Sequence, residues 1–251
     1  MLKTGNILEI SKISKRFGAL EALQQVDFEL NQSEIVGLVG DNGAGKSTLI
    51  KIISGVFPPD EGKILLEGKE VRLTCPNDAK NFGIETVFQH LALVENISVA
   101  RNVFLGREFV KPGIGRLFGL SDKRKEREEA QKALRSLDVQ IDSVNSLVEN
   151  LSGGQRQAVA IARTVYWNPK VLIMDEPTAA LAVKEVGKVL DLILNLKKIG
   201  VSIIVISHRM DDIFSVCDRV MALYQGTNFA DAYLKDTSRD EVIGWIMGKK
   251  D

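Results

Sequence analysis

Short apolar runs dominate the first third of the chain and predict β-strands. The runs lie at residues 7–10, 26–30, 35–39, 63–66, 70–73 and 84–88, and the fourth and fifth join through Glu67-Gly68-Lys69 as a hairpin. After the third run, apolar residues at 49, 50, 52 and 53 have the spacing of a helix, and Gly55 is placed to end it. This part of the chain therefore predicts an antiparallel sheet beside the start of a parallel one.

The pattern changes from strands to helices between residues 96 and 154. Residues 98–107 have helical periodicity, residues 109–119 are expected to form a glycine-containing loop, and residues 122–137 predict a charged helix that Ser121 can cap. On that helix, Glu128 and Lys132 have the i,i+4 spacing of an ion pair. We expect a helical subdomain at 96–154, inserted into a single domain whose core comprises residues 1–95 and 155–251.

Strands and helices alternate in the last part of the chain. Apolar runs at 171–175, 201–206 and 219–224 predict strands. Helices are expected from the segment 151–155 to about residue 167, over 184–199, and from Ser238 or Asp240 to residue 247. This alternation predicts a parallel sheet that is covered by helices on both faces.

A glycine-rich stretch links the third apolar run to the first helix. Residues 40–48, Gly40-Asp41-Asn42-Gly43-Ala44-Gly45-Lys46-Ser47-Thr48, fit the P-loop pattern G-x-x-x-x-G-K-[ST]. Their backbone N–H groups can converge on one anion, and the helix that follows adds the positive end of its dipole. Lys46 is expected near the β- and γ-phosphates, Ser47 on Mg²⁺ and Thr48 on the α-phosphate. The sequence thus predicts nucleotide binding by an α/β fold: a P-loop NTPase core with a parallel sheet, an N-terminal antiparallel β subdomain and the helical insert.

Polar side chains follow three other apolar strands. Asp175 closes the run 171–175 and is expected to hold Mg²⁺, and Glu176 comes next as a candidate general base. Gln89 follows the run 84–88, and His208 comes shortly after the run 201–206. By themselves, Gln89 and His208 are more typical of structural residues. However, ligand-binding groups gather at the carboxyl ends of the strands in open α/β sheets.

Composition narrows the possible partners. Lys plus Arg and Asp plus Glu are both 33 in the 251 residues, so the formal net charge is zero. We expect no nucleic-acid partner, because such binding usually needs a basic excess. Cys75 and Cys217 match no metal spacing and are expected to be reduced. Neither a signal peptide nor an apolar stretch of about 18 residues is present, so we expect a cytoplasmic chain that docks on a membrane protein rather than entering the bilayer.

The order of these motifs resembles the ATP-binding subunit of ABC transporters. The P-loop, Gln89, Leu151-Ser152-Gly153-Gly154-Gln155, residues 171–176 and His208 follow one another as in that family, and the resemblance covers essentially the whole chain. Residues 151–155 are the specific part, since other P-loop ATPases lack them. The resemblance implies an ATP-hydrolysing homodimer. Each of its two ATP molecules would lie between the P-loop of one subunit and residues 152–155 of the other.

The resemblance also implies roles for single residues. Phe17, which by itself is more typical of a core aromatic, would stack on adenine; Gln89 would contact Mg²⁺ and water, and His208 would sense the γ-phosphate. The implied catalytic residues are Glu176, His208, Gln89 and Lys46, and the implied metal contacts are Ser47, Gln89 and Asp175. The implied ATP contacts are Phe17, Gly40, Asn42, Gly43, Ala44, Gly45, Lys46, Ser47, Thr48, Ser152, Gly153, Gly154 and Gln155.

Residues 151–185 are most similar to ATPases of bacterial monosaccharide importers of the ribose, xylose and fructose class. That similarity implies transmembrane permease subunits as partners, a sugar-binding protein indirectly, and a position on the inner face of the cell membrane. Residues 91–98 and part of the helical insert are expected to dock the permease, with Leu93 exposed. Ala182 stands where most ABC ATPases have an Asp, as is common in this importer class.

Two alternatives stay open at this point. The first is an ABC ATPase of another importer or of an exporter, or one that acts on DNA or ribosomes; the last kind usually carries a coiled-coil or zinc insertion, tandem halves or a basic excess, and none is evident here. The second is a module that binds ATP without turnover. The presence of both Glu176 and His208 argues against it.

Overall fold

The computed structural model describes residues 5–113, 119–179 and 181–249, and within them the strands form two sheets. The four-stranded antiparallel sheet has the order β2-β1-β4-β5, and the six-stranded sheet has the order β10-β9-β3-β8-β7-β6. The strands are β1 (Asn6–Phe17), β2 (Leu20–Asn31), β3 (Ile35–Val39), β4 (Glu61–Leu66), β5 (Lys69–Val71), β6 (Ile84–Val87), β7 (Val171–Asp175), β8 (Ser202–Ile206), β9 (Arg219–Tyr224) and β10 (Thr227–Tyr233). Within the larger sheet only the β9–β10 pair is antiparallel.

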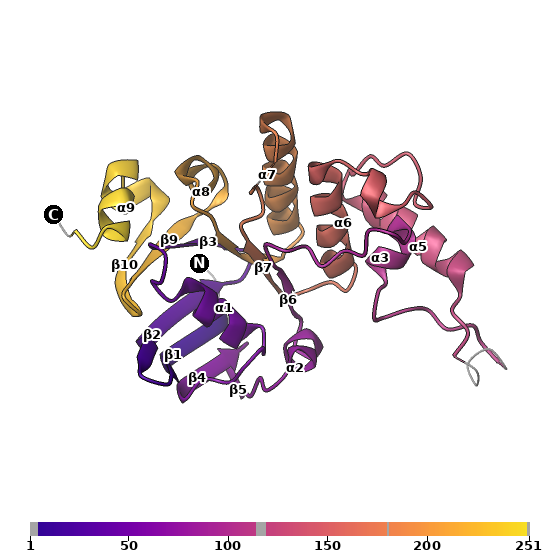
Figure 1. The fold of residues 1–251 in the computed structure, drawn as a ribbon. Helices are drawn as coiled ribbons and strands as arrows, with labels where there is room; N and C mark the ends of the chain where they lie inside the picture. Colours follow the sequence, from indigo (N-terminus) through magenta and orange to yellow (C-terminus); the bar gives the residue numbers. More distant parts are fainter. Residues whose placement is uncertain (1–4, 114–118, 180, 250–251) are drawn as a thin grey trace.

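Helix α1 lies between the two sheets, and helices α6, α7, α8 and α9 lie on the outer face of the larger sheet (Figure 1). The helices are α1 (Lys46–Ile53), α2 (Pro76–Asn81), α3 (Val99–Val103), α5 (Lys123–Ser136), α6 (Gly153–Val165), α7 (Val183–Lys198), α8 (Met210–Val216) and α9 (Arg239–Ile246). The buried apolar face of α1 packs with residues of both sheets in one core. A second core lies between the larger sheet and α6, α7, α8 and α9. This sandwich fixes the start of α1, and with it the P-loop, at the centre of the molecule.

The helical region lies beyond the β6 edge of the sheet, at the right of Figure 1. There α3 and α5 pack against α6, whose other neighbours are β6 and α7. Phe104 is fully buried, with ring centroids 4.9 Å from Phe109 and 4.8 Å from Tyr166. Because α6 contacts both α5 and the sheet, it joins the helical region to the core. Among the described residues, no helix is long and apolar enough to cross a membrane.

Several sequence predictions need correction. The strands expected at 7–10 and 26–30 extend over 12 residues each, because β1 and β2 pair along their whole length and bring Phe17 into β1. The helix expected at 98–107 covers only Val99–Val103. The sequence predicted neither α8 nor β10. Helix α8 has only seven residues, and β10 has a weak alternation of apolar and polar side chains, so neither gives a clear periodic signal. Of the loop expected at 109–119, residues 114–118 lie outside the described part.

The charged helix α5 begins one residue later than expected. Asp122, not Ser121, is its N-cap and accepts a hydrogen bond from the amide of Lys125, while the Ser121 hydroxyl donates to Glu126. The expected Glu128–Lys132 pair is also wrong: Glu128 pairs with Arg124. Lys132 pairs with Glu129 instead. These pairs are exposed, so the choice among neighbouring partners costs little free energy.

Arg219, at the start of β9, ties the two sheets together. Its Nε donates to Glu34 at 2.9 Å and its Nη1 donates to both oxygens of Asp231 at 2.7 and 2.6 Å. Its Nη2 donates to the carbonyl of Glu29 in β2, on the antiparallel sheet. Arg219 and Glu34 are both buried, so removing Arg219 would leave Glu34 as an unpaired buried charge and would destabilise the fold.

We therefore predict that Arg219→Leu destabilises the fold by about 3–5 kcal/mol, because it leaves the Glu34 carboxylate buried without its partner. Chemical denaturation of both proteins measures this loss. Arg16→Ala is the matched control, since it removes an exposed arginine–glutamate pair and should cost no more than about 1 kcal/mol. Equal losses for the two variants would show that burial of the Arg219 cluster contributes nothing.

Candidate functional site

Parallel pairing brings four strand ends to one edge of the larger sheet. In the ladder, Leu38 of β3 lies beside Ile206 of β8, and Asp175 of β7 lies beside the same residue on the other side. The next strand, β6, aligns Val87 with Met174. The segments that follow these ends are the P-loop, the Ser207-His208 pair, the Asp175-Glu176 pair and Gln89. The structure thus brings these segments to one edge of the sheet, where Lys46, Asp175, Glu176 and His208 lie close enough to interact electrostatically.

The P-loop has the backbone shape of an anion cradle. Gly43 and Gly45 have φ angles of +82° and +103°, which lie in the left-handed region that favours glycine. A Cβ on Gly45 would lie 2.8 Å from the carbonyl oxygen of Ala22, so no larger residue fits there. A Cβ on Gly43 would meet nothing within 4 Å, which leaves that side open for a phosphate. Gly45 also forms the N-cap of α1, so the helix dipole points into the cradle.

The ammonium group of Lys46 is folded into the loop. Its Nζ donates to the carbonyls of Gly40 at 2.7 Å and Asp41 at 2.9 Å. Desolvation lowers its pKa, and the nearby carboxylates of Glu176, Asp41 and Asp175 oppose that effect. The charge of Lys46 therefore lies between the loop carbonyls and the acidic end of β7.

Glu176 holds a carboxylate oxygen in an unusual setting. Its Oε1 is buried and has no hydrogen-bond partner among the described residues, and it lies 3.4 Å from Nε2 of His208. Burial raises the pKa of Glu176, and the neighbouring His208 opposes this. Glu176 also has a φ of +53°, held in part by the bond from its amide to the carbonyl of Ile206. A buried acceptor left free is typical of a functional group rather than of a packing residue.

Asp175 lies beside Glu176 and faces the P-loop lysine. Desolvation raises the pKa of Asp175, while Lys46 and His208 favour its charged form. A serine hydroxyl, a glutamine amide and a carboxylate at one sheet edge form the hard oxygen donor set that Mg²⁺ prefers. Ser47, Gln89 and Asp175 therefore fit a magnesium ion in their chemistry, and the Glu176 Oε1 beside Asp175 is an acceptor that lacks a hydrogen bond.

Phe17 is available for stacking. Its side chain is 46% exposed at the end of β1, and its ring packs edge-to-face on Phe57 with centroids 5.3 Å apart. The Lys15 ammonium lies 5.8 Å from the Phe17 centroid. The ring is therefore partly exposed, which differs from the core aromatic that an isolated Phe suggests.

Residues 152–155, here called the signature loop, open helix α6. Ser152 is the N-cap: its Oγ accepts from the amide of Gln155 at 3.3 Å, and the Gln155 side chain accepts from the amide of Ser152 at 3.0 Å. A cavity of about 440 Å³ beside this loop is lined by residues of 137–140, α6 and α7 and by none of the P-loop. Within one chain, the signature loop therefore does not share that cavity with the P-loop.

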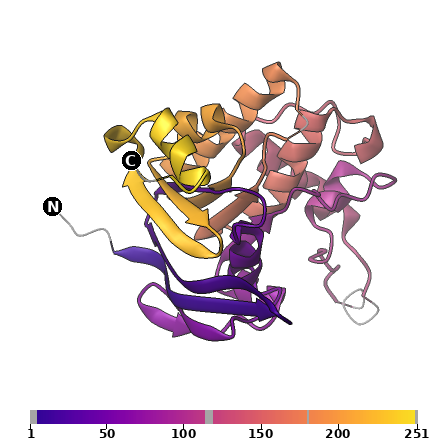
Figure 2. The same cartoon turned by 60° about the vertical axis from the view of Figure 1, so that its left-hand side comes forward.

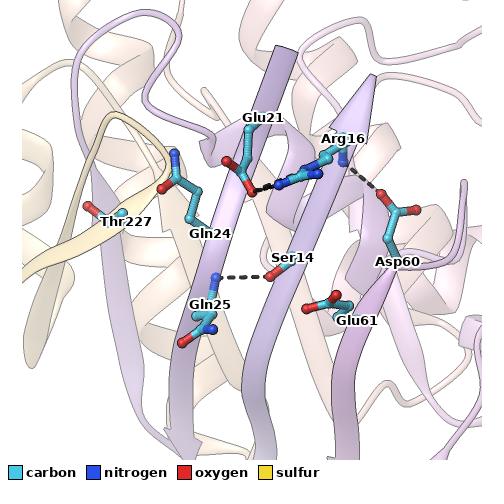
Figure 3. A pocket seen from close by; sticks show the side chains of 8 residues that line it. All are labelled: Ser14, Arg16, Glu21, Gln24, Gln25, Asp60, Glu61 and Thr227. Atoms are coloured by element: carbon cyan, nitrogen blue, oxygen red, sulfur yellow. Dashed lines mark hydrogen bonds and ion pairs between the residues drawn. The ribbon is translucent and has the colours of Figure 1, made fainter. Parts of the chain in front are cut away.

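A cavity of about 640 Å³ lies on the antiparallel sheet, apart from the P-loop residues (Figure 3). Its lining is wholly polar and contains no residue of 40–48: Ser14, Arg16, Glu21, Gln24, Gln25, Asp60, Glu61 and Thr227. The lining groups bond largely to one another, as Arg16 does with Glu21 at 3.0 Å and the amide of Gln25 does with Ser14 at 3.1 Å. Polar groups that already pair within the chain give no convergent site for a ligand.

A groove of about 370 Å³ runs between the core and the helical region. Apolar side chains line it, among them Phe88, Leu105 and Trp167, and so do the charged pair Arg107–Glu85 at 2.8 Å and Arg163. Phe88 precedes Gln89, so the groove adjoins the strand end that carries the site. The expectation for Leu93 is wrong: Leu93 is partly buried against the main core, because Arg163 donates to the carbonyls of Leu91 and Ala92 and holds that loop down.

Sequence reasoning missed two acidic side chains near the site. Asp212 is buried in the first turn of α8 and accepts a hydrogen bond from Thr178, which follows Glu176 by two residues. Glu185, in the first turn of α7, accepts a bond from the Ser152 hydroxyl. Neither belongs to a motif, and each partner is more than 30 residues away, so no local pattern signals the contact. Ala182 is the N-cap of α7 and offers no side-chain acceptor to it.

Comparison with known proteins shows similarity in sequence over most of the chain. The family model described as ABC transporter matches residues 23–179. The xylose/arabinose import ATP-binding protein of Sulfolobus acidocaldarius is 47% identical, over 94% of this chain and 92% of its own. The fructose import ATP-binding protein of Rhizobium meliloti is 45% identical, over 98% of this chain and 95% of its own.

Solved structures agree with these sequence matches. An ATP-binding cassette of an ABC transporter in its ADP conformation superposes with a TM-score of 0.83 at 29% identity, covering 98% of this chain and all of that one. A dimeric cassette in a post-hydrolysis state with ADP and phosphate superposes with a TM-score of 0.74 at 25% identity, covering 90% of this chain and 98% of that one. The P-loop edge, the signature loop and these matches lead to one conclusion: the chain belongs to the ABC transporter family, as one of its ATP-binding, ATP-hydrolysing cassettes.

Proposed function

We propose that this chain energises sugar import by hydrolysing ATP at two sites, each formed between two copies of the chain. The observation that carries the proposal is the sheet edge where Lys46, Asp175, Glu176 and His208 gather, with Glu176 Oε1 buried and unpartnered. The names of two relatives support a sugar as the transported substrate, since one is a xylose/arabinose import protein and the other a fructose import protein.

The proposed reaction begins with the phosphates in the P-loop. The amides of Gly43 to Ser47 and the start of α1 bind the anionic oxygens, and Lys46 transfers its bonds from the loop carbonyls to the β- and γ-phosphates. Phe17 presents its ring face to the adenine. Ser47, Asp175 and Gln89 would hold Mg²⁺, which would supply positive charge beside the phosphate oxygens.

Glu176 then acts as general base. Its Oε1 accepts a hydrogen bond from the attacking water and takes its proton, while the water oxygen bonds to the γ-phosphorus and the bond from that phosphorus to the bridging oxygen breaks, releasing ADP. Burial raises the pKa of Glu176, which makes the carboxylate a stronger base. His208 lies 3.4 Å away and holds the carboxylate while contacting the γ-phosphate. The carboxylate oxygen that folding leaves without a hydrogen bond thus receives one from the substrate water.

The second half of each site comes from the other copy. Ser152, Gly153 and Gly154 stand at the N-terminus of a 13-residue helix, where amides and dipole suit an anion. Because the cavity beside the signature loop is lined by no residue of the P-loop of its own chain, we assign its anion to a nucleotide on a second chain. The dimeric cassette among the structural neighbours supports this arrangement.

The groove beside Gln89 is the proposed contact for a transmembrane permease subunit. It combines exposed aromatic and aliphatic side chains with two arginines, and aromatic residues and arginine are enriched in protein interfaces. Its position lets a movement near Gln89 reach a bound partner. The chain would then lie on the inner face of the cell membrane, with a sugar-binding protein as an indirect partner. We propose that residues 96–154 move with this partner as a helical subdomain, separate from the core of 1–95 and 155–251.

The two halves of the chemistry are separable by mutation. We predict that Lys46→Ala greatly weakens ATP binding, whereas Glu176→Gln binds ATP normally and loses about 10²–10⁴ in turnover rate, as expected for removal of a general base. Titration of fluorescent ATP and a phosphate-release assay measure the two effects. Asp41→Asn serves as the control, because it removes a carboxylate near Lys46 without removing the base. Near-normal hydrolysis by Glu176→Gln would exclude Glu176 as the base.

A charge in the groove should uncouple the chain from its partner. We predict that Leu105→Glu lowers co-purification with the permease and sugar uptake, with ATP hydrolysis by the isolated chain unchanged, because Leu105 lies in the groove and outside the nucleotide site. Ile199→Glu is the matched control, since Ile199 is 71% exposed at the end of α7 and outside the groove. Equal binding by both variants would show that the permease docks elsewhere.

A further inference from the structure

Glu185 binds the signature loop of its own chain. Its Oε1 accepts a hydrogen bond of 2.6 Å from the Ser152 hydroxyl, a length typical of a charge-assisted bond. The two residues lie 33 positions apart, one at the start of α6 and the other at the start of α7. The contact therefore joins two helix N-termini and places a carboxylate against the loop.

The carboxylate lies close to the backbone of the loop as well. A Cβ on Gly154 would approach Oε1 of Glu185 to 3.0 Å and its Cβ to 2.9 Å, so the side chain is packed against this glycine. Hydrogen bonding by Ser152, with smaller contributions from the amides of Gly154 and Ala182, lowers the pKa of Glu185 against the opposing effect of desolvation. Glu185 is therefore ionised at neutral pH, and its negative charge faces the amides that suit an anion.

The Ser152 hydroxyl cannot serve two acceptors at once. A serine hydroxyl carries one proton, and its oxygen already accepts from the amide of Gln155 at 3.3 Å. While Ser152 donates to Glu185, it has no proton for a phosphate oxygen. A γ-phosphate that reaches the loop would also meet the Glu185 charge at short range, where like charges repel.

We propose that Glu185 is an intrachain competitor of the γ-phosphate: it holds the Ser152 hydroxyl and must release it before the signature loop can bind ATP carried by a second copy. This inference rests on the proposed two-chain site. Glu185 acts through Ser152 and weakens ATP-dependent association, so that the closed dimer forms only when the γ-phosphate can displace a carboxylate. ADP lacks the γ-phosphate and cannot displace it.

The dissociation constant of the ATP-bound dimer tests this competition. In a Glu176→Gln background, sedimentation at saturating ATP should show that Glu185→Ala tightens the dimer at least about tenfold, since a bond to a charged group is lost from the separated chains alone. Glu185→Gln should tighten it less, because the amide oxygen still accepts from Ser152 but carries no charge. Asp191→Asn, which removes an exposed charge from the same helix, should leave the constant unchanged.

A second comparison separates competition from a purely structural role. When Ser152→Ala is already present, Glu185→Ala should tighten the ATP-bound dimer by a smaller factor, because the hydroxyl for which Glu185 and the γ-phosphate compete is gone. An unchanged or weaker dimer with both Glu185 substitutions, at an unaltered melting temperature, would overturn the inference and leave the two-chain site standing. If the parent fails to dimerise with ATP, the proposed two-chain site fails, and the inference falls with it.

Discussion

The parallel ladder β3-β8-β7-β6 is the constraint on which the rest of the site depends. Its register aligns Asp175 with Ile206 and Val87 with Met174, so the segments after these strands must emerge at one edge. A shift of one residue would turn every side chain to the other face and separate the base from the P-loop. The ladder is held by apolar residues on both faces, with α1 between the sheets and α6–α9 on the other side; Figure 2 shows the same layers from a second direction.

Function draws on groups that folding leaves in an unfavourable state. The Glu176 Oε1 lies buried without a hydrogen-bond partner, and Lys46 carries its charge in a desolvated loop. Both conditions cost stability, and both are relieved if water and phosphates bind where we propose. The signature loop shows the opposite state, since Glu185 already satisfies Ser152. One half of each proposed site is therefore poised to bind, while the other must first give up an internal partner.

The sequence predicted local features well and distant contacts poorly. The strand Ile35–Val39, the start of α1 and the left-handed Gly55 follow from apolar runs and glycine chemistry, so they were predicted correctly. Leu93 was predicted to be exposed and is not, because a bond from Arg163, 70 residues further along, determines its loop. The cap of α5 depended on which of two adjacent polar residues faces the helix, which spacing alone does not decide. The Glu185–Ser152 contact needs the packing of α6 on α7, which no motif encodes.

The central claim is that each ATP site needs the base of one chain and the signature loop of another. Mixing two inactive variants tests it directly: Glu176→Gln, which keeps its signature loop, and Gly154→Asp, which keeps its base. A mixed dimer has one site with both intact parts and one with both altered parts. The account predicts that the mixture hydrolyses ATP well above the sum of the separate variants. If each site lay within a single chain, the mixture would be as inactive as its components, and that result would contradict the account.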